Sequence, residues 1–296
     1  MFTPDDPQQA DVVFEGDNLA AAALLPDGAF ALVYFDPPFN TGRSQRRQNL
    51  THVRREAGPG TIVGFQGASY ERIKGRLFAY DDDFEDYWLF LEPRIMAAYR
   101  LLADDGTLYL HLDYREAHYA KVLLDAIFGR DSFLNEIVWA YDYGAKPTTR
   151  WPTKHDTILV YVKDPAHYVF HAEEVDREPY MAPGLVTPEK AARGKRPTDV
   201  WWHTIVSPTG REKTGYPTQK PLGILRRILR ASSSPGDWVL DLFGGSGTTG
   251  AAAAELGRRF VLADANPDAI EVMRARLPDG TAFEEAVPPG TQSVEG

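Results

Sequence analysis

The apolar run "ALVYF" ends in a group of residues that could do chemistry: Asp36, Pro37, Pro38 and Phe39. Because proline cannot donate a hydrogen bond to a sheet, a strand must stop here. A carboxylate and a neighbouring backbone carbonyl can accept two hydrogen bonds from an exocyclic amino group, and Phe39 offers a ring on which a planar base can stack. The pattern predicts a site that holds an amino-bearing base for attack on an electrophile. The structural alternative is a proline-ended strand whose Phe packs in the core.

A second candidate site is the glycine-rich stretch "DLFGGSGTTG" over 241–250, which follows an apolar run and opens a helical pattern. Glycines let the backbone approach a ligand closely, and a helix start offers free N–H groups. Gly245, Gly247 and Gly250 match GxGxxG, and Asp264 stands 19 residues after Gly245, where an acid can bond a ribose. The stretch predicts a nucleoside cofactor, which on this pattern is NAD or S-adenosylmethionine. The alternative is a tight turn that requires small residues for packing.

Strand and helix patterns alternate along the elements that must position these residues. This alternation predicts an α/β fold with a doubly wound, mostly parallel sheet. Ligands of such folds bind at the carboxyl ends of the strands, where both motifs lie. Strands are expected at 12–16, 30–35, 107–113, 135–141, 156–162, 237–245 and 258–265. Helices are expected at 18–25, 84–102, 115–128, 220–232 and 248–257.

Composition narrows the function further. The chain has no cysteine, which excludes a disulfide and a cysteine nucleophile, and its seven histidines lack the spacing of metal ligands, so we expect no metal. It has no apolar run of about 18 residues and no apolar N-terminal signal, so we expect a cytoplasmic protein without a membrane partner.

Charge is unevenly distributed along the chain. The net charge of −10 argues weakly against a nucleic-acid partner, yet the segment from Arg43 to Arg76 holds eight Arg or Lys residues and only two Glu. Phosphate contacts depend on local charge, so this segment can bind DNA. The alternative is an ordinary solvated surface.

The motifs together resemble the bacterial amino-group DNA methyltransferases of the beta class. The stretches "VYFDPPFNTG", "LADDGTLYLHLD", "KHDTILVYVKD", "TGYPTQKP", "WVLDLFGGSGTTG" and "GRRFVLADANPDAI" occur in the order typical of that class. The resemblance implies a seven-stranded Rossmann-like methyltransferase sheet with a small irregular target-recognition region. It also implies S-adenosylmethionine as methyl donor and double-stranded DNA as substrate, with the target base flipped out of the duplex.

The resemblance assigns roles to individual residues. Asp36, Pro37, Pro38 and Phe39 would hold the target base. Lys220 has a structural alternative as a solvated cation at a helix start, and His155 as an ordinary strand-end residue. The implied cofactor-binding residues are Asp17, Asp241, Phe243, Gly245, Gly247, Thr248, Asp264, Thr218, Gln219 and Lys220. The candidate DNA-binding residues are Arg43, Arg46, Arg47, Arg54, Arg55, Lys74 and His155.

The target atom follows partly from the residues and partly from the resemblance. Methylation of cytosine carbon 5 requires a thiolate, which this chain lacks, so an exocyclic nitrogen is the target. Asp at the first motif position is typical of adenine-N6 enzymes, which we favour over cytosine-N4 enzymes. The remaining alternatives are an NAD-dependent oxidoreductase, a protein or RNA methyltransferase and a non-catalytic DNA-binding module. The chain departs from the family pattern in having Asp264 for Glu and Phe39 for Tyr.

The predicted organisation is one catalytic domain with an insertion. Residues 1–163 and 217–280 would form the methyltransferase domain, with a variable DNA-facing loop at 41–80. Residues 164–216 would be the target-recognition insertion and 281–296 a disordered tail. We expect a homodimer, which is frequent in this class, and a cognate restriction endonuclease is a candidate partner.

Overall fold

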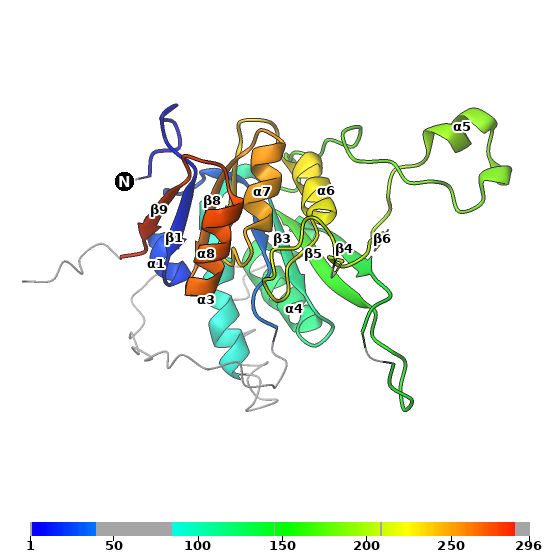
Figure 1. Cartoon of the computed structure of the whole chain (residues 1–296), viewed down its shortest axis with the longest axis horizontal. Helices are drawn as coiled ribbons and strands as arrows, with labels where there is room; N and C mark the ends of the chain where they lie inside the picture. The colour runs from blue at the N-terminus through cyan, green and yellow to red at the C-terminus, as the bar shows by residue number, and fades with distance from the viewer. Residues whose placement is uncertain (1, 40–84, 145, 208, 288–296) are drawn as a thin grey trace, which may run out of the picture.

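In a computed structural model of the chain, residues 2–39, 85–144, 146–207 and 209–287 are described. Their strands form one sheet of nine, in the order β6-β4-β5-β3-β2-β7-β8-β1-β9, with helices on both faces (Figure 1). The strands are β1 (Val12–Glu15), β2 (Phe30–Phe35), β3 (Leu102–Leu112), β4 (Phe133–Ala140), β5 (His155–Val162), β6 (Val200–Trp202), β7 (Trp238–Asp241), β8 (Arg259–Asp264) and β9 (Ala282–Glu285).

The helices bury apolar stripes against the two faces of this sheet. Leu91 and Ile95 of α3 belong to the core on one face, with α1 and α4. Ile224 and Ile228 of α6 belong to the core on the other face, with α7 and α8. The helices are α1 (Asn18–Ala23), α3 (Glu85–Leu101), α4 (Ala117–Phe128), α5 (Pro188–Arg193), α6 (Leu222–Ser232), α7 (Thr248–Glu255) and α8 (Pro267–Arg276), with the short 3₁₀ helices η2 (Arg130–Ser132) and η3 (Pro183–Leu185). None of these helices is long and apolar enough to cross a membrane.

The predicted α/β fold with a mostly parallel sheet is confirmed, since every strand pair is parallel except the two made by β5. In the described part of the chain the sheet has nine strands and not seven. The additional strand β6 lies in the stretch expected to be irregular and pairs with β4. The tail predicted for 281–296 is wrong in its first part, because β9 pairs with β1 along its length. Residues 288–296 lie outside the described ranges.

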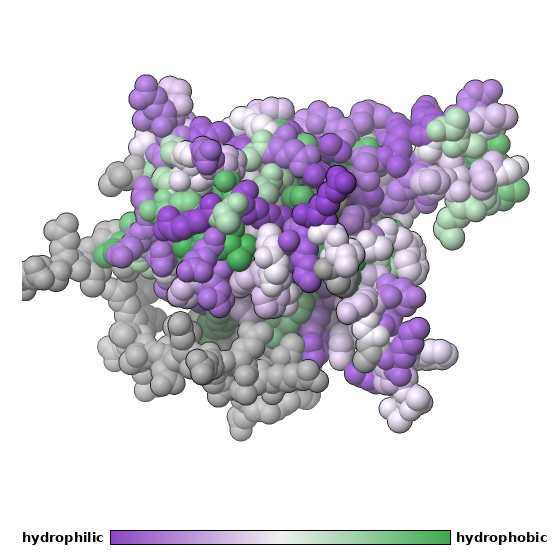
Figure 2. All heavy atoms as spheres, in the orientation of Figure 1, coloured by the Kyte–Doolittle hydropathy of each residue, from purple (hydrophilic) through white to green (hydrophobic). Residues whose placement is uncertain are grey.

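Two segments project from the sheet. The arm (residues 141–144 and 146–154) lies between β4 and β5 and extends from the edge where β4 ends (lower right in Figure 1). The lobe (residues 178–195) carries η3 and α5 and extends beyond β6. Its base is closed by Glu178 and Lys195, which exchange two backbone hydrogen bonds of 2.8 Å. Figure 2 shows apolar residues on the surface of the lobe, where Met181 is 93% exposed.

Candidate active site

The two motifs lie side by side because their strands are neighbours. β2 and β7 are parallel partners, with Leu32 opposite Val239, so both chains leave the sheet at the same edge. The residues at the two ends touch directly, since the rings of Phe35 and Phe243 meet edge to face at 5.4 Å between centroids. The motif at Asp36 and the glycine turn therefore form one site, at the edge where doubly wound folds bind ligands.

Asp36 is paired with Lys220, which the family resemblance assigns to cofactor binding. Its Oδ2 forms an ion pair with Nζ of Lys220, and both side chains are largely buried. The Lys220 backbone carbonyl accepts a hydrogen bond of 3.1 Å from Oγ1 of Thr248 in the glycine turn. Lys220 thus contacts both halves of the site. The interpretation of Lys220 as a solvated cation is wrong, because the residue is only 9% exposed.

Phe39 is half-buried and lies beside polar groups. Nζ of Lys220 is 5.1 Å from the centre of its ring, and the ring of His111 is 6.1 Å away at a tilt of 49°. Pro37 is buried and Pro38 exposed. The four motif residues therefore lie together at the end of β2, with Phe39 packed against the core on one side.

The glycine turn depends on backbone conformations that other residues rarely adopt. Gly245 and Gly247 have φ of 51° and 72°. A methyl group on Gly247 would also lie 2.8 Å from Cγ of Met273, so part of this motif serves packing. The Asp264 carboxylate fixes the turn by accepting hydrogen bonds from the N–H of Gly245 at 2.7 Å and of Asn266 at 2.8 Å.

Asp241 is a buried acid at the end of β7. Its two oxygens accept hydrogen bonds from Oγ1 of Thr249 at 2.6 Å and from the N–H of Phe243 at 2.9 Å. Burial raises the pKa of Asp241 to about 7 in spite of these bonds. An acid in this state would gain most from a cation placed beside it, which fits the ammonium group of a methionine-containing cofactor.

Asp17 performs a structural task in this structure. Its carboxylate caps α1 by accepting hydrogen bonds of 3.0 Å from the N–H groups of Leu19 and Ala20. The next residue, Asn18, donates to the carbonyl of Leu242 at 3.2 Å and accepts from Nε of Arg94 at 2.9 Å. Sequence reasoning missed Asn18 and Arg94, which tie two helices to the glycine turn. A role for Asp17 at the cofactor stays a prediction.

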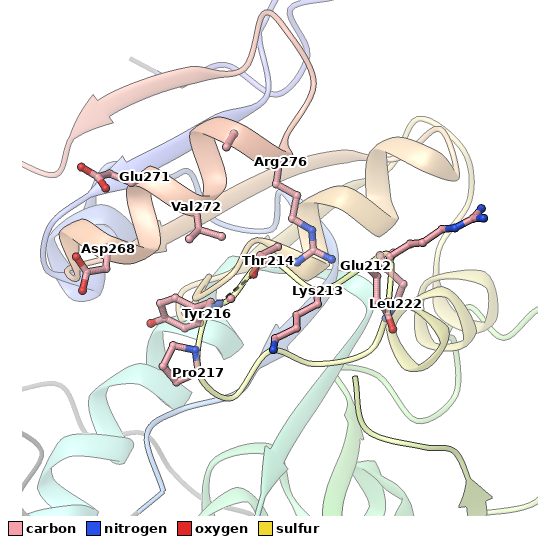
Figure 3. A pocket seen from close by; sticks show the side chains of 13 residues that line it. Glu212, Lys213, Thr214, Tyr216, Pro217, Leu222, Asp268, Glu271, Val272 and Arg276 are labelled. Carbon is pink, nitrogen blue, oxygen red and sulfur yellow. Dashed lines mark hydrogen bonds between the residues drawn. The ribbon is translucent and has the colours of Figure 1, made fainter. Parts of the chain in front are cut away.

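The segment before α6 lies over the glycine turn. Thr218 has φ of 62° and is exposed, whereas the Gln219 side chain folds back on its own segment and donates to the carbonyl of Glu212 at 2.6 Å. Tyr216 borders both the turn and a cavity of about 810 Å³ against α8 (Figure 3). None of the predicted cofactor residues lines this cavity. Cofactor roles for Thr218 and Gln219 stay predictions.

Of the predicted DNA-binding residues, only His155 lies within the described part of the chain. His155 begins β5 at the edge that carries the site. The other six, Arg43, Arg46, Arg47, Arg54, Arg55 and Lys74, lie outside the described residues. The residue after His155 has the more notable position, because Asp156 is buried and lies 3.3 Å from Nε2 of His111. Sequence reasoning missed this pair, although two polar residues at core-facing positions of apolar strands are a detectable signal.

Comparison with known proteins agrees with this geometry. The family described as "DNA methylase", of the N6/N4 methyltransferases, matches residues 30–275. The DNA adenine methyltransferase YhdJ of Escherichia coli K12 is 28% identical over 277 residues, covering 91% of this chain and 83% of that protein. The type II methyltransferase M.HpaI of Haemophilus parainfluenzae is 31% identical over 259 residues, covering 88% of this chain and 71% of that one.

Solved structures show the same fold at lower identity. The PvuII cytosine-N4-specific DNA methyltransferase superposes with a TM-score of 0.59 at 16% identity, over 92% of this chain and 94% of that one. The M1.HpyAVI complex with S-adenosylmethionine gives a TM-score of 0.54 at 20% identity, over 90% and 99%. The predicted family and the predicted cofactor are confirmed. The chain belongs to the N6/N4 DNA methylases, a family of S-adenosylmethionine-dependent DNA amino-methyltransferases.

Proposed function

We propose that this protein methylates N6 of adenine at a specific sequence in duplex DNA, using Asp36, Pro37 and Phe39 to hold the flipped base. One observation carries the proposal: the Asp36–Phe39 motif and the glycine turn leave neighbouring parallel strands and touch through Phe35 and Phe243. A base held by the first is thereby next to a methyl donor held by the second.

The chain's own groups orient the amino nitrogen. The Asp36 carboxylate and the Pro37 carbonyl accept its two hydrogens, and Phe39 stacks on the ring of the base. A carboxylate oxygen can accept more than one hydrogen bond, so the contact with Lys220 leaves Asp36 able to act. Two fixed acceptors hold the amino hydrogens, so that the nitrogen lone pair turns out of conjugation with the ring and toward the methyl donor. This positioning and electrostatic preorganisation replaces any covalent step with the protein.

The cofactor half of the site supplies the electrophile. S-adenosylmethionine brings a methyl group on a positively charged sulfur. The buried Asp241 is suited to its ammonium group, and the Gly245–Gly247 backbone to close approach. In the transfer a C–N bond forms, the C–S bond breaks with its electron pair going to sulfur, and the methylated nitrogen loses one proton. Asp36, which accepts a hydrogen of this nitrogen, lies on the route of that proton.

Adenine is preferred to cytosine as the target. Asp36 occupies the position at which the family's adenine enzymes carry Asp, and YhdJ, a relative at 28% identity, is named a DNA adenine methyltransferase. The PvuII enzyme named as cytosine-N4-specific shares the fold at 16% identity, which carries no information on the target base.

DNA would lie along the edge of the sheet where β2, β4 and β7 end. The arm projects from this edge and carries Lys146, Arg150 and an almost fully exposed Trp151. We propose that residues 164–216 act as the target-recognition insertion in the catalytic domain of 1–163 and 217–280. We further propose that the protein works as a homodimer in the bacterial cytoplasm, beside a cognate restriction endonuclease.

Single-molecule sequencing of DNA from cells that express the protein tests the function directly. We expect N6-methyladenine at one short sequence. Asp36→Ala should abolish this mark while S-adenosylmethionine affinity stays within about twofold, because the acid holds the base and not the cofactor. Asp104→Ala, which alters an exposed acid near the start of β3 at the opposite edge, should leave the mark intact. N4-methylcytosine would refute the choice of base, and an active Asp36→Ala variant would refute the site.

A further inference from the structure

Four polar side chains cross four neighbouring strands beneath the Asp36–Phe39 motif. The Tyr34 hydroxyl lies 2.8 Å from Nδ1 of His111, and Nε2 of His111 lies 3.3 Å from Oδ2 of Asp156. The Tyr141 hydroxyl donates to Oδ1 of Asp156 at 3.0 Å. We call these four residues the cross-strand chain. They come from β2, β3, β5 and the residue that follows β4, which are adjacent in the sheet.

The cross-strand chain is buried in a mostly apolar layer. His111 is fully buried and the Asp156 residue is 8% exposed, on the face that also holds Leu32 and Ile158. Polar groups cost free energy at such positions unless each has a partner. Because Tyr34 donates to Nδ1 of His111, the imidazole proton lies on Nε2 and points at Asp156. Each hydrogen bond of the cross-strand chain therefore joins a donor to an acceptor. The four side chains therefore act as one hydrogen-bonded unit.

The cross-strand chain meets the motif at the Phe39 ring. The His111 ring packs at 6.1 Å from the ring of Phe39. Burial works to raise the pKa of Asp156, but the hydrogen bonds from His111 and Tyr141 and the charge of Lys220 lower it. The pKa of Asp156 therefore lies below its ordinary value, and its carboxylate stays charged beside His111.

We propose that His111 and Asp156, held by Tyr34 and Tyr141, are positioning residues for methyl transfer. They fix the Phe39 ring through His111, whose Nε2 is held by Asp156, so that the arriving base meets a formed platform. The inference rests on the proposed function of the motif. A displacement of about 1 Å at a reacting centre can slow a reaction about 100-fold, so loosening this support reduces turnover.

The test removes single hydrogen bonds and leaves the rings in place. Tyr34→Phe, Tyr141→Phe and Asp156→Asn each break one link of the cross-strand chain. Tyr109→Phe is the matched control, because its hydroxyl bonds Oγ of Ser232 at 2.7 Å on the same face of the sheet. We expect kcat on duplex DNA to fall about 10-fold or more in the three variants and to stay within about twofold in the control. The dissociation constant of S-adenosylmethionine should stay within about twofold throughout.

A second readout separates positioning from stability. A duplex that carries 2-aminopurine at the target position brightens when the base leaves the stack, and we expect less brightening with the chain variants than with Tyr109→Phe. The proposal is overturned if the three variants keep the kcat of the control, or if the loss of kcat follows the loss of melting temperature across all four. Should Asp156→Asn fail to fold, the two tyrosine variants decide. An active Asp36→Ala protein refutes the proposed function. If the wild type is active and the variants of the cross-strand chain keep its activity, only this inference is refuted.

Discussion

At the scale of single residues, Lys220 lies between the Asp36–Phe39 motif and the glycine turn, so it could act on the base or on the cofactor. The resemblance assigned it to the cofactor carboxylate, whereas its ammonium group contacts Asp36 and lies above the Phe39 ring. If the ammonium group holds Asp36, then Lys220→Met leaves a largely buried carboxylate without its cation. We expect kcat to fall about 10-fold, with a smaller change in S-adenosylmethionine affinity, measured by steady-state kinetics and titration calorimetry.

The control for Lys220 lies at the opposite edge of the sheet. Lys163 follows β5, and its ammonium group donates to the Leu102 carbonyl at 2.6 Å. Lys163→Met removes the same charge in a similarly shielded setting, and we expect turnover to be unaffected. A Lys220→Met protein with weak cofactor binding and normal kcat would assign the lysine to the cofactor after all.

Asp241 gives the site a dependence on pH that can be measured in the free protein. Its pKa of about 7 in the folded state exceeds that of an unfolded Asp, so the folded state holds a proton that the unfolded state releases. The contribution of Asp241 to the free energy of unfolding is therefore largest below about pH 4. It decreases between about pH 4 and about pH 7, and it does not change further at higher pH. Asp241→Asn should remove this slope, which is worth roughly 4 kcal/mol at most, in denaturant titrations across the range.

The same residue predicts proton release on cofactor binding. A cation beside Asp241 favours its carboxylate, so binding of S-adenosylmethionine should release a proton near pH 6.5 and strengthen as pH rises toward about 7. Calorimetry in buffers of different ionisation enthalpy measures this proton. Asp241→Asn should abolish the release, and an unchanged release in that variant would place the proton on another group.

The residues recovered from the sequence are those whose function depends on local order. Asp36, Phe39 and the glycine turn can be recognised in the sequence because proline and glycine determine the backbone conformation next to them. The Asp36–Lys220 and His111–Asp156 contacts join distant parts of the chain, and they exist only once the strand order is known. A single sequence does not encode that order in any local pattern.

At the scale of elements, the strands with strong periodic patterns were predicted and the weakly patterned ones were not. β9 is only half-buried and follows a turn at Gly280, so its four residues resemble a loose tail until β1 supplies a pairing edge. β6 is shorter still, with three residues, and gains its pairing from β4. In both cases the neighbouring strand makes the element, and propensity contributes little.

The arm is the described element best placed to grip DNA next to the site. Trp151 is 93% exposed on the arm, between cations at Arg150 and Lys154. Such an aromatic can stack on a base or fill the space that a flipped base leaves. We expect Trp151→Ala to weaken binding of the target duplex about 10-fold, measured by fluorescence anisotropy at fixed salt, since base–aromatic stacking contributes about 1–3 kcal/mol.

The matched control for Trp151 is Tyr99, an exposed aromatic at the opposite edge. It lies in the last turn of α3, just before β3 begins, and its ring packs on Phe128 at 5.0 Å, away from the site. Tyr99→Ala should leave DNA affinity within about twofold. Equal losses in both variants would mean that DNA does not lie along the arm.

At the scale of the whole molecule, charge and shape have to be reconciled. A chain with a net charge of −10 repels DNA at long range, so binding has to come from local groups of cations such as those of the arm and of residues 43–76. Contacts of this kind release counterions, so affinity should depend steeply on salt although the protein is acidic overall.

The lobe allows the division between catalysis and recognition to be tested in one protein. None of the residues 179–193 is buried, and the pair Glu178 and Lys195 already has the hydrogen bonds of a strand pair that a two-residue turn can close. Replacing residues 179–194 by Asn-Gly should therefore preserve the fold, the melting temperature to within a few degrees and the S-adenosylmethionine affinity. If residues 164–216 recognise the target, this shortened protein loses sequence-specific methylation, which single-molecule sequencing detects. A shortened protein that still marks the same sequence would move recognition to the arm and to residues 41–80.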